Sequence, residues 1–593
     1  MLVVDVEVYQ DYFLCMFKNL DSGKTAAFEM FDGQPLNKAR VSDLMRNHVT
    51  IGFNSNSYDL FIIASALADA PCASLKNLSD AIIKSNLPAW RIARDRQVRL
   101  PQQWDHIDLI EVAPGQASLK IYGGRMHCQR MQDLPIDPDA SITVEQRREM
   151  RVYCKNDLDT TERLFRTLEP AIRLRAEMGK QYGGIDLRSK SDAQIAEAVI
   201  KHELSEMTGK EYRPARAEVG SVVRYRDPLI VGFRNAALME VFERILKTGF
   251  PIGVNGAVKM PDWLAQGRIR IGGTDYQMGI GGLHSCEKRQ SIVAGPDESL
   301  LDLDVASYYP SIILKLKLAP EKMGDDFLKV YQSIVTRRLD AKRRNDKLTA
   351  DTLKVTINGS FGKLGSMYSS LYAPELMIQT TITGQLCLLM LIERLESVGI
   401  RVVSANTDGV VVLCPTARSA DLEQVVWDWM LDTSFELERA DYRAIHSRDV
   451  NNYIAVKLDG STKRKGVYAE PGLAKNPEFT IVADAITAFL VRGTPIKQTV
   501  EDCRSLSKFV SIRRVDGGGV WRGDYLGKAV RFYYSTEVSA EEQISYAKNR
   551  NKVPKTDGAR PAMTLPERFP DDVDIDRYVN LAKEGLKDMG VMK

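Results

Sequence analysis

The sequence predicts a multidomain protein of mixed α+β and α/β class, and three observations support that prediction. A chain of 593 residues corresponds to about three to five domain-sized units. Residues 2–9 alternate apolar and polar side chains, which is the period of a β-strand with one buried face. Residues 143–168 have the apolar rhythm of a helix, and residues 401–413 place two β-branched runs around a polar turn, which predicts a buried hairpin.

The composition is that of a globular protein, with 44% apolar and 27% charged residues. No apolar run reaches the roughly 18 residues that span a bilayer. The longest, Leu386–Leu395, contains Glu393 and predicts a buried helix. The N-terminus lacks the basic segment of a signal peptide. We therefore expect a cytoplasmic protein with no membrane partner.

Cysteine and histidine usage restricts the metals that the chain could bind. The eight cysteines and six histidines are dispersed, and the sequence contains no Cys-x-x-Cys pair. This pattern argues against a structural zinc site and against a disulfide framework. Any bound metal is then expected to be a hard cation with oxygen ligands, such as Mg²⁺ or Mn²⁺.

Charge is informative locally, because the net charge is only +3. Residues 329–347 carry seven Lys or Arg and two Asp. Such a run is either a solvated helix face or a phosphate-binding element.

An apolar segment, residues 299–303, ends on Asp304 and is followed by a turn of small and aromatic residues up to Ser311. A carboxylate at a strand end can hold a divalent cation at a fixed point, and the N–H groups of a turn can meet a phosphate. An ordinary strand with a proline-terminated turn explains this segment equally well. Asp302, on the same strand face as Asp304, either shares such a site or flanks it.

The N-terminal strand places Asp5 and Glu7 on one face, a spacing that suits two oxygen ligands. Taken alone, Asp-x-Glu is more typical of an edge strand with a polar outer face. Asp59 follows a strand-and-turn pattern at residues 51–58. The helix of residues 143–168 begins with Thr143 and Gln146 three positions later, which predicts a capping box.

Three motifs follow one another over the first 160 residues: Asp5-x-Glu7, Asn54-x-x-x-Tyr-Asp59 and Tyr153-x-x-x-Asp157. Together they resemble the motifs of the 3′–5′ proofreading exonuclease of DNA polymerases. The resemblance implies a ribonuclease H-like domain in which Asp5, Glu7, Asp59 and Asp157 hold two metal ions, while Tyr153 orients the attacking water. Two cations suit the in-line hydrolysis of a phosphodiester. Asn54 then contacts the trimmed strand, or only caps its turn.

Residues 304–311 resemble the first motif, Asp-x-x-Ser-x-Tyr-Pro-Ser, of the family B DNA polymerases. Residues 354–362 resemble the second, with Gly359 in place of Ser and Phe361 in place of Tyr. Residues 406–408 resemble the Asp-Thr-Asp turn of the family, with Asn406 in place of its first Asp. The resemblance implies that Asp304, Val305 and Asp408 hold two Mg²⁺ or Mn²⁺ ions. The amide of Asn406 should weaken metal affinity or change the cation preference.

The residues that the resemblance assigns to the incoming deoxynucleoside triphosphate are Ser307, Tyr308, Tyr309, Arg338, Lys342, Lys354 and Asn358. Lys354 would neutralise the triphosphate as a point charge. Arg338 and Lys342 resemble the Arg-x-x-x-Lys pair of the fingers helix. The ring of Tyr309 would stack under the sugar and leave no room for a 2′-OH, or it is a core tyrosine.

The residues that the resemblance assigns to DNA are Asn54, Gly281, Gly282, Phe361, Tyr453 and Lys465. Gly281 and Gly282 stand in the place of the Tyr-x-Gly-Gly loop, which here lacks its Tyr. Tyr453 stands in the Lys-x-Tyr motif, with Asn451 in place of Lys. Residues 463–466 supply the missing charge or form only a basic turn.

The C-terminal sequence gives less specific indications. Arg513, Arg514, Arg522, Lys528 and Arg531, interleaved with aromatic residues, suit a thumb that holds duplex phosphates. Residues 549–561 predict an exposed loop, and the chain closes with an amphipathic helix after residue 577.

The motif order implies an exonuclease domain and a right-hand polymerase. The expected divisions are 1–185 exonuclease, 186–298 linking region and start of the palm, 299–324 palm, 325–362 fingers, 363–470 palm, and 471–593 thumb and C-terminal region. Only 50 positions separate residues 304 and 354, so the fingers should be an antiparallel helix pair, 325–345 and 348–361. The insertions of protein-primed members have no room here.

We therefore expect a monomeric, compact bacteriophage or prophage replicase in the bacterial cytoplasm, acting on primer–template DNA with deoxynucleoside triphosphates. A processivity factor, helicase or primase would assist it. Two alternatives are an exonuclease whose polymerase half is impaired, and a primer–template binding protein with neither activity. The six retained carboxylates argue against the last.

Overall fold

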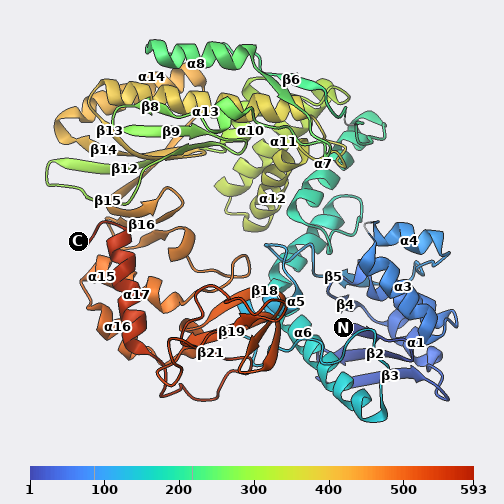
Figure 1. Ribbon diagram of the computed structural model, residues 1–593. Helices are drawn as coiled ribbons and strands as arrows, with labels where there is room; N and C mark the ends of the chain where they lie inside the picture. Colours follow the sequence, from blue (N-terminus) through green and yellow to red (C-terminus); the bar gives the residue numbers. More distant parts are fainter. Residues whose placement is uncertain (86, 217, 593) are drawn as a thin grey trace.

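The computed structural model describes residues 1–85, 87–216 and 218–592. It is a mixed α/β, multidomain structure, as the sequence predicts. Figure 1 shows a large sheet with its helices (green to orange) above two smaller regions, the N-terminal region in blue and the C-terminal region in red.

The N-terminal region is a sheet of order β3-β2-β1-β4-β5 covered by helices. Its strands are β1 (Leu2–Val8), β2 (Tyr12–Asn19), β3 (Thr25–Phe31), β4 (Thr50–Gly52) and β5 (His106–Asp108). Its helices are α1 (Lys38–Asn47), η1 (Ser55–Ser57), α2 (Asp59–Leu67), α3 (Cys72–Lys84), α4 (Ala89–Asp95), α5 (Leu119–Arg125) and α6 (Val144–Gln181). The predicted alternation of β1 is confirmed, because Val4, Val6 and Val8 are buried while Asp5 and Glu7 are partly exposed.

The long helix α6 begins as the sequence predicts, since Thr143 and Gln146 form the reciprocal hydrogen bonds of a capping box. It continues beyond residue 168 to Gln181 and contains Pro170. Ile172 and Met178 keep one face of this extension buried, which compensates for the backbone hydrogen bond that the proline removes.

The large sheet has the order β17-β16-β15-β12-β14-β13-β10-β9-β8, with β11 paired to β15. Its strands are β8 (Ile269–Ile271), β9 (Thr274–Met278), β10 (Leu283–Ser285), β11 (Gln290–Val293), β12 (Glu298–Val305), β13 (Arg401–Asn406), β14 (Gly409–Pro415), β15 (Leu437–Asp449), β16 (Asn452–Lys457) and β17 (Thr462–Arg464). The predicted hairpin is confirmed: β13 and β14 pair antiparallel and close at Asn406 and Gly409. Helices α8 (Ala236–Lys247), α10 (Tyr308–Lys315), α13 (Pro374–Ser397) and α14 (Ser419–Thr433) share its hydrophobic core.

Helix α13 corrects the expectation that no segment is long and apolar enough to span a bilayer, and it confirms that residues 386–395 lie in a buried helix. It contains an 18-residue window of mean hydropathy 1.4, long and apolar enough by composition to cross a membrane. However, 83% of that window is buried inside the protein, as predicted for residues 386–395. Its side chains fill the core beneath the large sheet.

The predicted helix pair is confirmed as α11 (Gly324–Arg343) and α12 (Lys347–Leu364). Helix α12 begins earlier than the sequence suggested, because Asp346 caps it by accepting from the Thr349 N–H. Helix α7 (Asp192–Thr208) packs against α12. At Gly359 a Cβ atom would lie 2.5 Å from the carbonyl oxygen of Asp192, so this close packing requires the glycine that replaces the expected serine.

The C-terminal region combines a sheet of order β20-β18-β19-β21 with three helices. Its elements are α15 (Thr480–Arg492), α16 (Ile496–Asp502), β18 (Ser511–Trp521), β19 (Asp524–Tyr534), β20 (Ser545–Tyr546), β21 (Ala559–Pro561) and α17 (Ile575–Asp588). The amphipathic C-terminal helix is confirmed as α17. The exposed loop predicted at 549–561 is wrong in part, because Val553 and Ala559 are buried and β21 pairs with β19.

Arg531 corrects the prediction that it holds duplex phosphates. Its side chain is fully buried and donates to the carbonyl oxygens of Ala562 at 2.6 Å and Cys128 at 2.8 Å. Two further bonds, at 3.2 Å, reach the carbonyl oxygens of Gln129 and Met563. Burial lowers the pKa of Arg531 to about 10. Arg531 therefore joins the C-terminal sheet to the segment that follows α5.

Candidate active sites

The first site is a set of four carboxylates, Asp5, Glu7, Asp59 and Asp157, which we call the N-terminal cluster. Asp5 and Glu7 project from β1, Asp59 is the first residue of α2, and Asp157 lies on α6. The Val6 N–H donates to Oδ1 of Asp59 at 3.2 Å, so α2 is anchored to the strand between Asp5 and Glu7. The structure thus brings all four predicted carboxylates together, from three separate elements.

Asp108, which the sequence did not single out, organises the loop before Asp59. It is 2% exposed and accepts from the N–H groups of Asn54 and Asn56, both at 2.8 Å. Asn54 has φ 61°, a left-handed conformation that asparagine tolerates. Its side chain is exposed and, within the described residues, makes no capping hydrogen bond, so the interpretation as a simple turn cap is wrong.

Lys120, from α5, is the second residue that the sequence did not indicate. Its ammonium donates to both carboxylate oxygens of Asp157 and lies 4.3 Å from the centre of the Tyr153 ring. Lys120 therefore fixes Asp157 and Tyr153 relative to each other. A single lysine carries no motif, which is why its role emerges only from the packing of α5 against α6.

The N-terminal cluster holds more negative charge than its surroundings balance. Burial, followed by the charge of Asp157, raises the pKa of Asp5 to about 7, although Lys120 opposes the shift. Burial also raises the pKa values of Glu7 and Asp59, with the charge of Asp5 adding to both. Burial raises the pKa of Asp157 too, against the opposing effect of Lys120. One lysine among four carboxylates leaves the site in need of protons or cations.

This donor set fits hard divalent cations. Ligating atoms of Asp5, Glu7 and Cys154 lie within 4.8 Å of one another. Burial raises the pKa of the Cys154 thiol well above its ordinary value, so it stays protonated, and it donates to Oδ2 of Asp5 at 3.5 Å. The remaining ligands are carboxylate oxygens, which Mg²⁺ and Mn²⁺ prefer.

The second site is the pair Asp304 and Asp408, which we call the hairpin pair. Asp304 lies near the end of β12, and Asp408 lies in the turn between β13 and β14. The Val305 N–H donates to the Asp408 carbonyl oxygen at 2.7 Å, and Asp304 stands opposite Gly409 in the strand register. These main-chain contacts hold the two carboxylates side by side.

Gly409 is required by this arrangement. A Cβ atom at position 409 would lie 2.1 Å from Oδ1 of Asp304, a distance that real side chains do not adopt. The turn before it is strained as well, because Thr407 has φ 46°. Thr407 is held there by its N–H, which donates to the Leu283 carbonyl oxygen at 2.8 Å.

Lys463 balances part of the charge beside the hairpin pair. Its Nζ lies 2.7 Å from an oxygen of Asp302 and 3.6 Å from an oxygen of Asp304. Asp302 is buried and also accepts from the Tyr442 hydroxyl. Asp302 therefore flanks the pair, with its charge already engaged. Lys463 lies in the basic run 463–466. The sequence predicts that another member of this run, Lys465, contacts DNA, and the Lys465 residue is exposed.

The hairpin pair is less deeply buried than the N-terminal cluster, and the Asp304 side chain is 47% exposed. Burial and the charge of Asp302 raise the pKa of Asp304, while Lys463 opposes the shift. Burial raises the pKa of Asp408 against Lys463 and Lys465. The pKa of Lys463 is raised, because its contacts with Asp302 outweigh the effect of burial.

Helices α11 and α12 bring three predicted phosphate ligands together. Arg338 and Lys342 from α11 and Lys354 from α12 line one hollow of about 470 Å³. The Arg338 guanidinium also donates to the Ser307 hydroxyl at 3.4 Å, which connects this hollow to the turn after Asp304. Asn358 is exposed on α12, four positions beyond Lys354.

Tyr308 and Tyr309 have different environments although they are adjacent. Tyr308 is buried and its hydroxyl donates to the Gly384 carbonyl oxygen at 2.6 Å, so only its main chain remains for a ligand. Tyr309 is partly exposed, its ring centre lies 4.4 Å from that of Phe361, and its hydroxyl donates to the Gly281 carbonyl oxygen at 2.6 Å. Tyr309 thus joins the turn after β12 to helix α12 and to the loop that contains Gly281.

The remaining predicted DNA contacts are positioned by main-chain packing. A Cβ atom at Gly282 would lie 2.8 Å from Thr407, so the close approach that this glycine permits is to the hairpin turn of the same chain. The Tyr453 carbonyl oxygen accepts from the Lys465 N–H at 2.9 Å, which joins these two predicted DNA contacts. Asn406 is partly exposed at the end of β13, opposite His284.

Comparison with known proteins gives partial similarities. No family model matches the chain. It is 23% identical over 260 residues to a DNA polymerase of Archaeoglobus fulgidus, covering 38% of this chain and 32% of that protein. It is 27% identical over 129 residues to DNA polymerase 1 of Sulfolobus acidocaldarius, covering 21% and 14% of the two chains. The chain therefore spans at most about a third of these curated relatives.

A solved structure also matches, that of the family B DNA polymerase from the archaeon Pyrobaculum calidifontis. The identity is 16% and the TM-score is 0.41, with 100% of this chain and 78% of that chain covered.

Proposed function

We propose that this protein is a template-directed DNA polymerase of the family B type, which adds deoxynucleotides to the 3′ end of a primer and proofreads by 3′–5′ exonuclease action. The observation that carries the proposal is the pairing of Asp304 and Asp408 at a hairpin turn beside a basic hollow, with a second carboxylate cluster in the N-terminal region. The names of the two curated archaeal relatives support the polymerase part.

In this proposal the hairpin pair binds two Mg²⁺ or Mn²⁺ ions, with Val305 beside them. Such ions supply positive charge to the attacking and leaving oxygens of a transferred phosphate. The basic hollow of Arg338, Lys342 and Lys354 would bind the triphosphate of the incoming nucleotide. The main chain of the 305–309 turn would hold its β- and γ-phosphates, with Ser307 held by Arg338.

The N-terminal cluster would hold the metal ions of the proofreading reaction. Lys120 holds Asp157 in place, and Tyr153, whose ring lies under the Lys120 ammonium, would orient the water that attacks the terminal phosphodiester. The exposed side chain of Asn54 would contact the strand being trimmed. This region would correspond to a ribonuclease H-like domain, and the large sheet, the α11–α12 pair and the C-terminal region to palm, fingers and thumb.

The remaining proposals concern the nucleic acid and the setting. Phe361 would pack near the nascent base pair, and Gly281, Tyr453 and Lys465 would contact primer–template DNA. The short connection between α11 and α12 favours an enzyme that extends a nucleic-acid primer rather than a protein primer. A compact enzyme of this kind suits the replication of a bacteriophage or prophage genome with the help of a processivity factor, helicase or primase.

A labelled primer annealed to a longer template tests the proposal in one assay. With Mg²⁺ and all four deoxynucleoside triphosphates, the primer should lengthen to the end of the template. When the nucleotides are omitted, the same primer should shorten from its 3′ end. A primer that stays unchanged under both conditions would contradict both proposed activities.

Two observations favour a second candidate, an exonuclease with an impaired polymerase half. Asn406 removes one carboxylate from the hairpin turn, and Lys463 partly balances Asp304. Both changes reduce the negative charge available to metal ions. The same assay separates the candidates, because this one predicts primer shortening without any extension at Mg²⁺ or Mn²⁺ concentrations that support degradation.

A further inference from the structure

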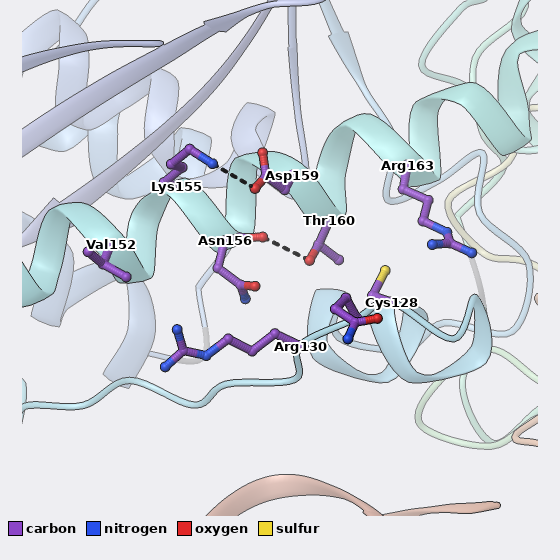
Figure 2. A pocket seen from close by; sticks show the side chains of 9 residues that line it. Cys128, Arg130, Val152, Lys155, Asn156, Asp159, Thr160 and Arg163 are labelled. Atoms are coloured by element: carbon purple, nitrogen blue, oxygen red, sulfur yellow. Dashed lines mark hydrogen bonds and ion pairs between the residues drawn. The ribbon is translucent and has the colours of Figure 1, made fainter. Parts of the chain in front are cut away.

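Two surfaces of the N-terminal region carry arginines outside both carboxylate sites. The first is a hollow of about 410 Å³ beside α6, and its lining includes Arg130 and Arg163. Figure 2 shows these two side chains at opposite ends of the hollow and pointing apart, so they do not converge on one ligand. The second surface surrounds α4, where arginines accompany an exposed aromatic ring, and we call it the α4 surface.

The charge of the α4 surface comes from arginines. Residues 89–99 contain four arginines and one acidic residue, Asp95. The four arginines are all exposed: Arg91, Arg94, Arg96 and Arg99. Arg94 bonds Asp95 at 3.2 Å. Within the described residues, the side chains of the other three form no ion pair and no hydrogen bond, so three guanidinium groups are available to an anionic ligand.

Trp90 supplies the aromatic ring of this surface. Its side chain is 58% exposed, whereas tryptophan is highly buried on average. The guanidinium carbon of Arg94 lies 5.5 Å from the centre of the ring, a distance at which cation–π attraction holds the two groups together. The exposed part of the ring can stack on another planar group.

The packing of α4 directs the ring and the arginines outward. Ile92 and Ala93 are buried, which fixes the opposite side of this short helix against the protein. Ile83 and Leu87, which precede α4, are exposed and add apolar surface close to it in the sequence. Figure 1 shows α4 at the outer end of the N-terminal region, apart from the large sheet. The α4 surface therefore faces solvent.

These features discriminate among three kinds of anionic partner. A bilayer binds helices that insert an apolar face, and the apolar face of α4 is already buried in the protein. Duplex DNA presents phosphates, but its bases are stacked on one another and do not reach an exposed ring. A single strand presents phosphates to arginines and unpaired bases to an aromatic side chain at the same time. The observations therefore favour a single-stranded nucleic acid.

We propose that the α4 surface binds single-stranded DNA, with one base stacked on Trp90 and the phosphates on either side of it bound by the unpaired arginines. Every base has a π-face, so the binding should depend little on sequence. The choice of DNA over RNA rests on the proposed function, under which the unpaired part of a template strand is the ligand. Binding itself requires neither of the two proposed activities.

Photocrosslinking tests the position of the base directly. A short thymidine oligonucleotide that carries 5-iodouracil is irradiated with the full chain in EDTA, and the crosslinked peptide is identified by mass spectrometry. The crosslink should fall on Trp90. Trp427 is the internal control, because it is 64% exposed on α14, which has four acidic residues and no lysine or arginine. Trp427 should stay free of crosslinks, since those carboxylates repel phosphates.

A charge variant tests the part played by the arginines. Arg91→Gln with Arg96→Gln should lower the affinity, measured from the crosslink yield at Trp90, about tenfold to hundredfold, because charge-assisted contacts are lost. The slope of log affinity against log salt concentration should become shallower by about 0.7 for each phosphate contact removed. Arg173→Gln, which changes an exposed α6 arginine paired with Glu169, is the matched control and should change neither value.

The same oligonucleotide annealed to its complement should crosslink far less, because its bases are no longer unpaired. Absence of a crosslink at Trp90, equal crosslinking by the duplex, or a yield that the arginine variant leaves unchanged would each overturn the proposal. So would binding to phosphatidylserine–phosphatidylcholine vesicles that Trp90→Ala abolishes, without any oligonucleotide crosslink, which would assign the surface to a membrane. A chain that crosslinks at Trp90 but neither extends nor degrades a primer would refute the proposed function and leave this inference standing.

Discussion

In the N-terminal cluster four carboxylates share one lysine, whereas beside the hairpin pair a lysine is bonded to a third, buried aspartate. Asp59 and Asp157 are almost completely buried, while the Asp304 side chain is about half exposed. The N-terminal cluster is thus a deep site with uncompensated charge, and the hairpin pair is an open one with part of its charge already balanced. Under the proposed function, this difference would make the N-terminal cluster the more dependent on cations and would leave the hairpin pair open enough for a triphosphate.

The largest effect is expected when one carboxylate of the hairpin pair is removed, because this change should affect only one of the two proposed activities. Asp408→Ala should lower nucleotide addition by about a thousandfold or more, because the hairpin pair loses half of its metal ligands. Degradation of the primer in the absence of nucleotides should stay unchanged. Asp441→Asn, on the neighbouring strand β15, is the control and should leave both rates intact. Equal loss of both activities would mean that the two clusters are not independent.

A second change tests the charge balance beside the hairpin pair. Lys463→Met should lower nucleotide addition about tenfold to hundredfold, because buried Asp302 loses its cationic partner and Asp304 loses a positioning contact. The Mg²⁺ concentration that gives half-maximal extension should fall, since a competing positive charge is gone. Lys463→Arg should restore most of the rate. An unchanged rate and an unchanged Mg²⁺ requirement would show that Lys463 is only a surface charge.

A smaller effect is expected on nucleotide selection, which under the proposed function depends on the surroundings of the hairpin pair and not on the N-terminal cluster. Tyr309→Ala should relax the discrimination against ribonucleotides by about tenfold or more, because its ring no longer closes the space beside Phe361. Tyr309→Phe keeps the ring and should keep the discrimination, although the hydroxyl bond to Gly281 is lost. The measurement is the ratio of kcat/KM for matched deoxy- and ribonucleotides. Unchanged ratios in both variants would make Tyr309 a core residue.

The smallest expected effect is on the stability of the folded chain, and it comes from the uncompensated charge of the N-terminal cluster. Because the folded-state pKa of Asp5 is about 7, above its ordinary value of 3.8, the metal-free folded chain retains protons that the unfolded chain has released. The free energy of unfolding should therefore fall as pH rises from about 4 to about 7. Melting in EDTA should occur a few degrees lower at pH about 8 than at pH about 5, and Mg²⁺ should reverse the loss.

The control for this measurement is Asp5→Asn with Glu7→Gln, which removes two of the crowded charges. That variant should show a smaller pH dependence in EDTA and a smaller response to Mg²⁺. A variant that follows the unmodified chain at every pH would place the origin of the effect outside the N-terminal cluster.

Many residues of the two sites could be predicted from the sequence, because their carboxylates belong to local patterns of strands, turns and helices. Asp304 ends an apolar strand, Asp408 stands in a hairpin turn, and Asp157 lies four positions from Tyr153 on one helix face. Each such pattern is set by backbone period and turn chemistry, which short stretches of sequence contain. The helix pair α11 and α12 could be predicted for the same reason.

The residues that support these carboxylates could not be predicted from the sequence, because their partners are distant along the chain. Lys120 reaches Asp157 from another helix, and Lys463 reaches Asp302 from a strand 161 positions away. Asp108 bonds a loop that precedes it by about 50 positions. Arg531 was assigned to DNA because basic residues between aromatics suggest a phosphate surface, but tertiary packing buries it completely. Nothing in a short segment distinguishes these outcomes.

The central claim, that two separate carboxylate sites carry two separate activities, is tested most directly by comparing two variants on one labelled primer–template. Asp304→Ala should degrade the primer without nucleotides and fail to extend it with them. Asp5→Ala with Glu7→Ala should extend the primer and fail to degrade it. Extension by Asp304→Ala, or degradation by the double variant at the rate of the unmodified chain, would contradict the account.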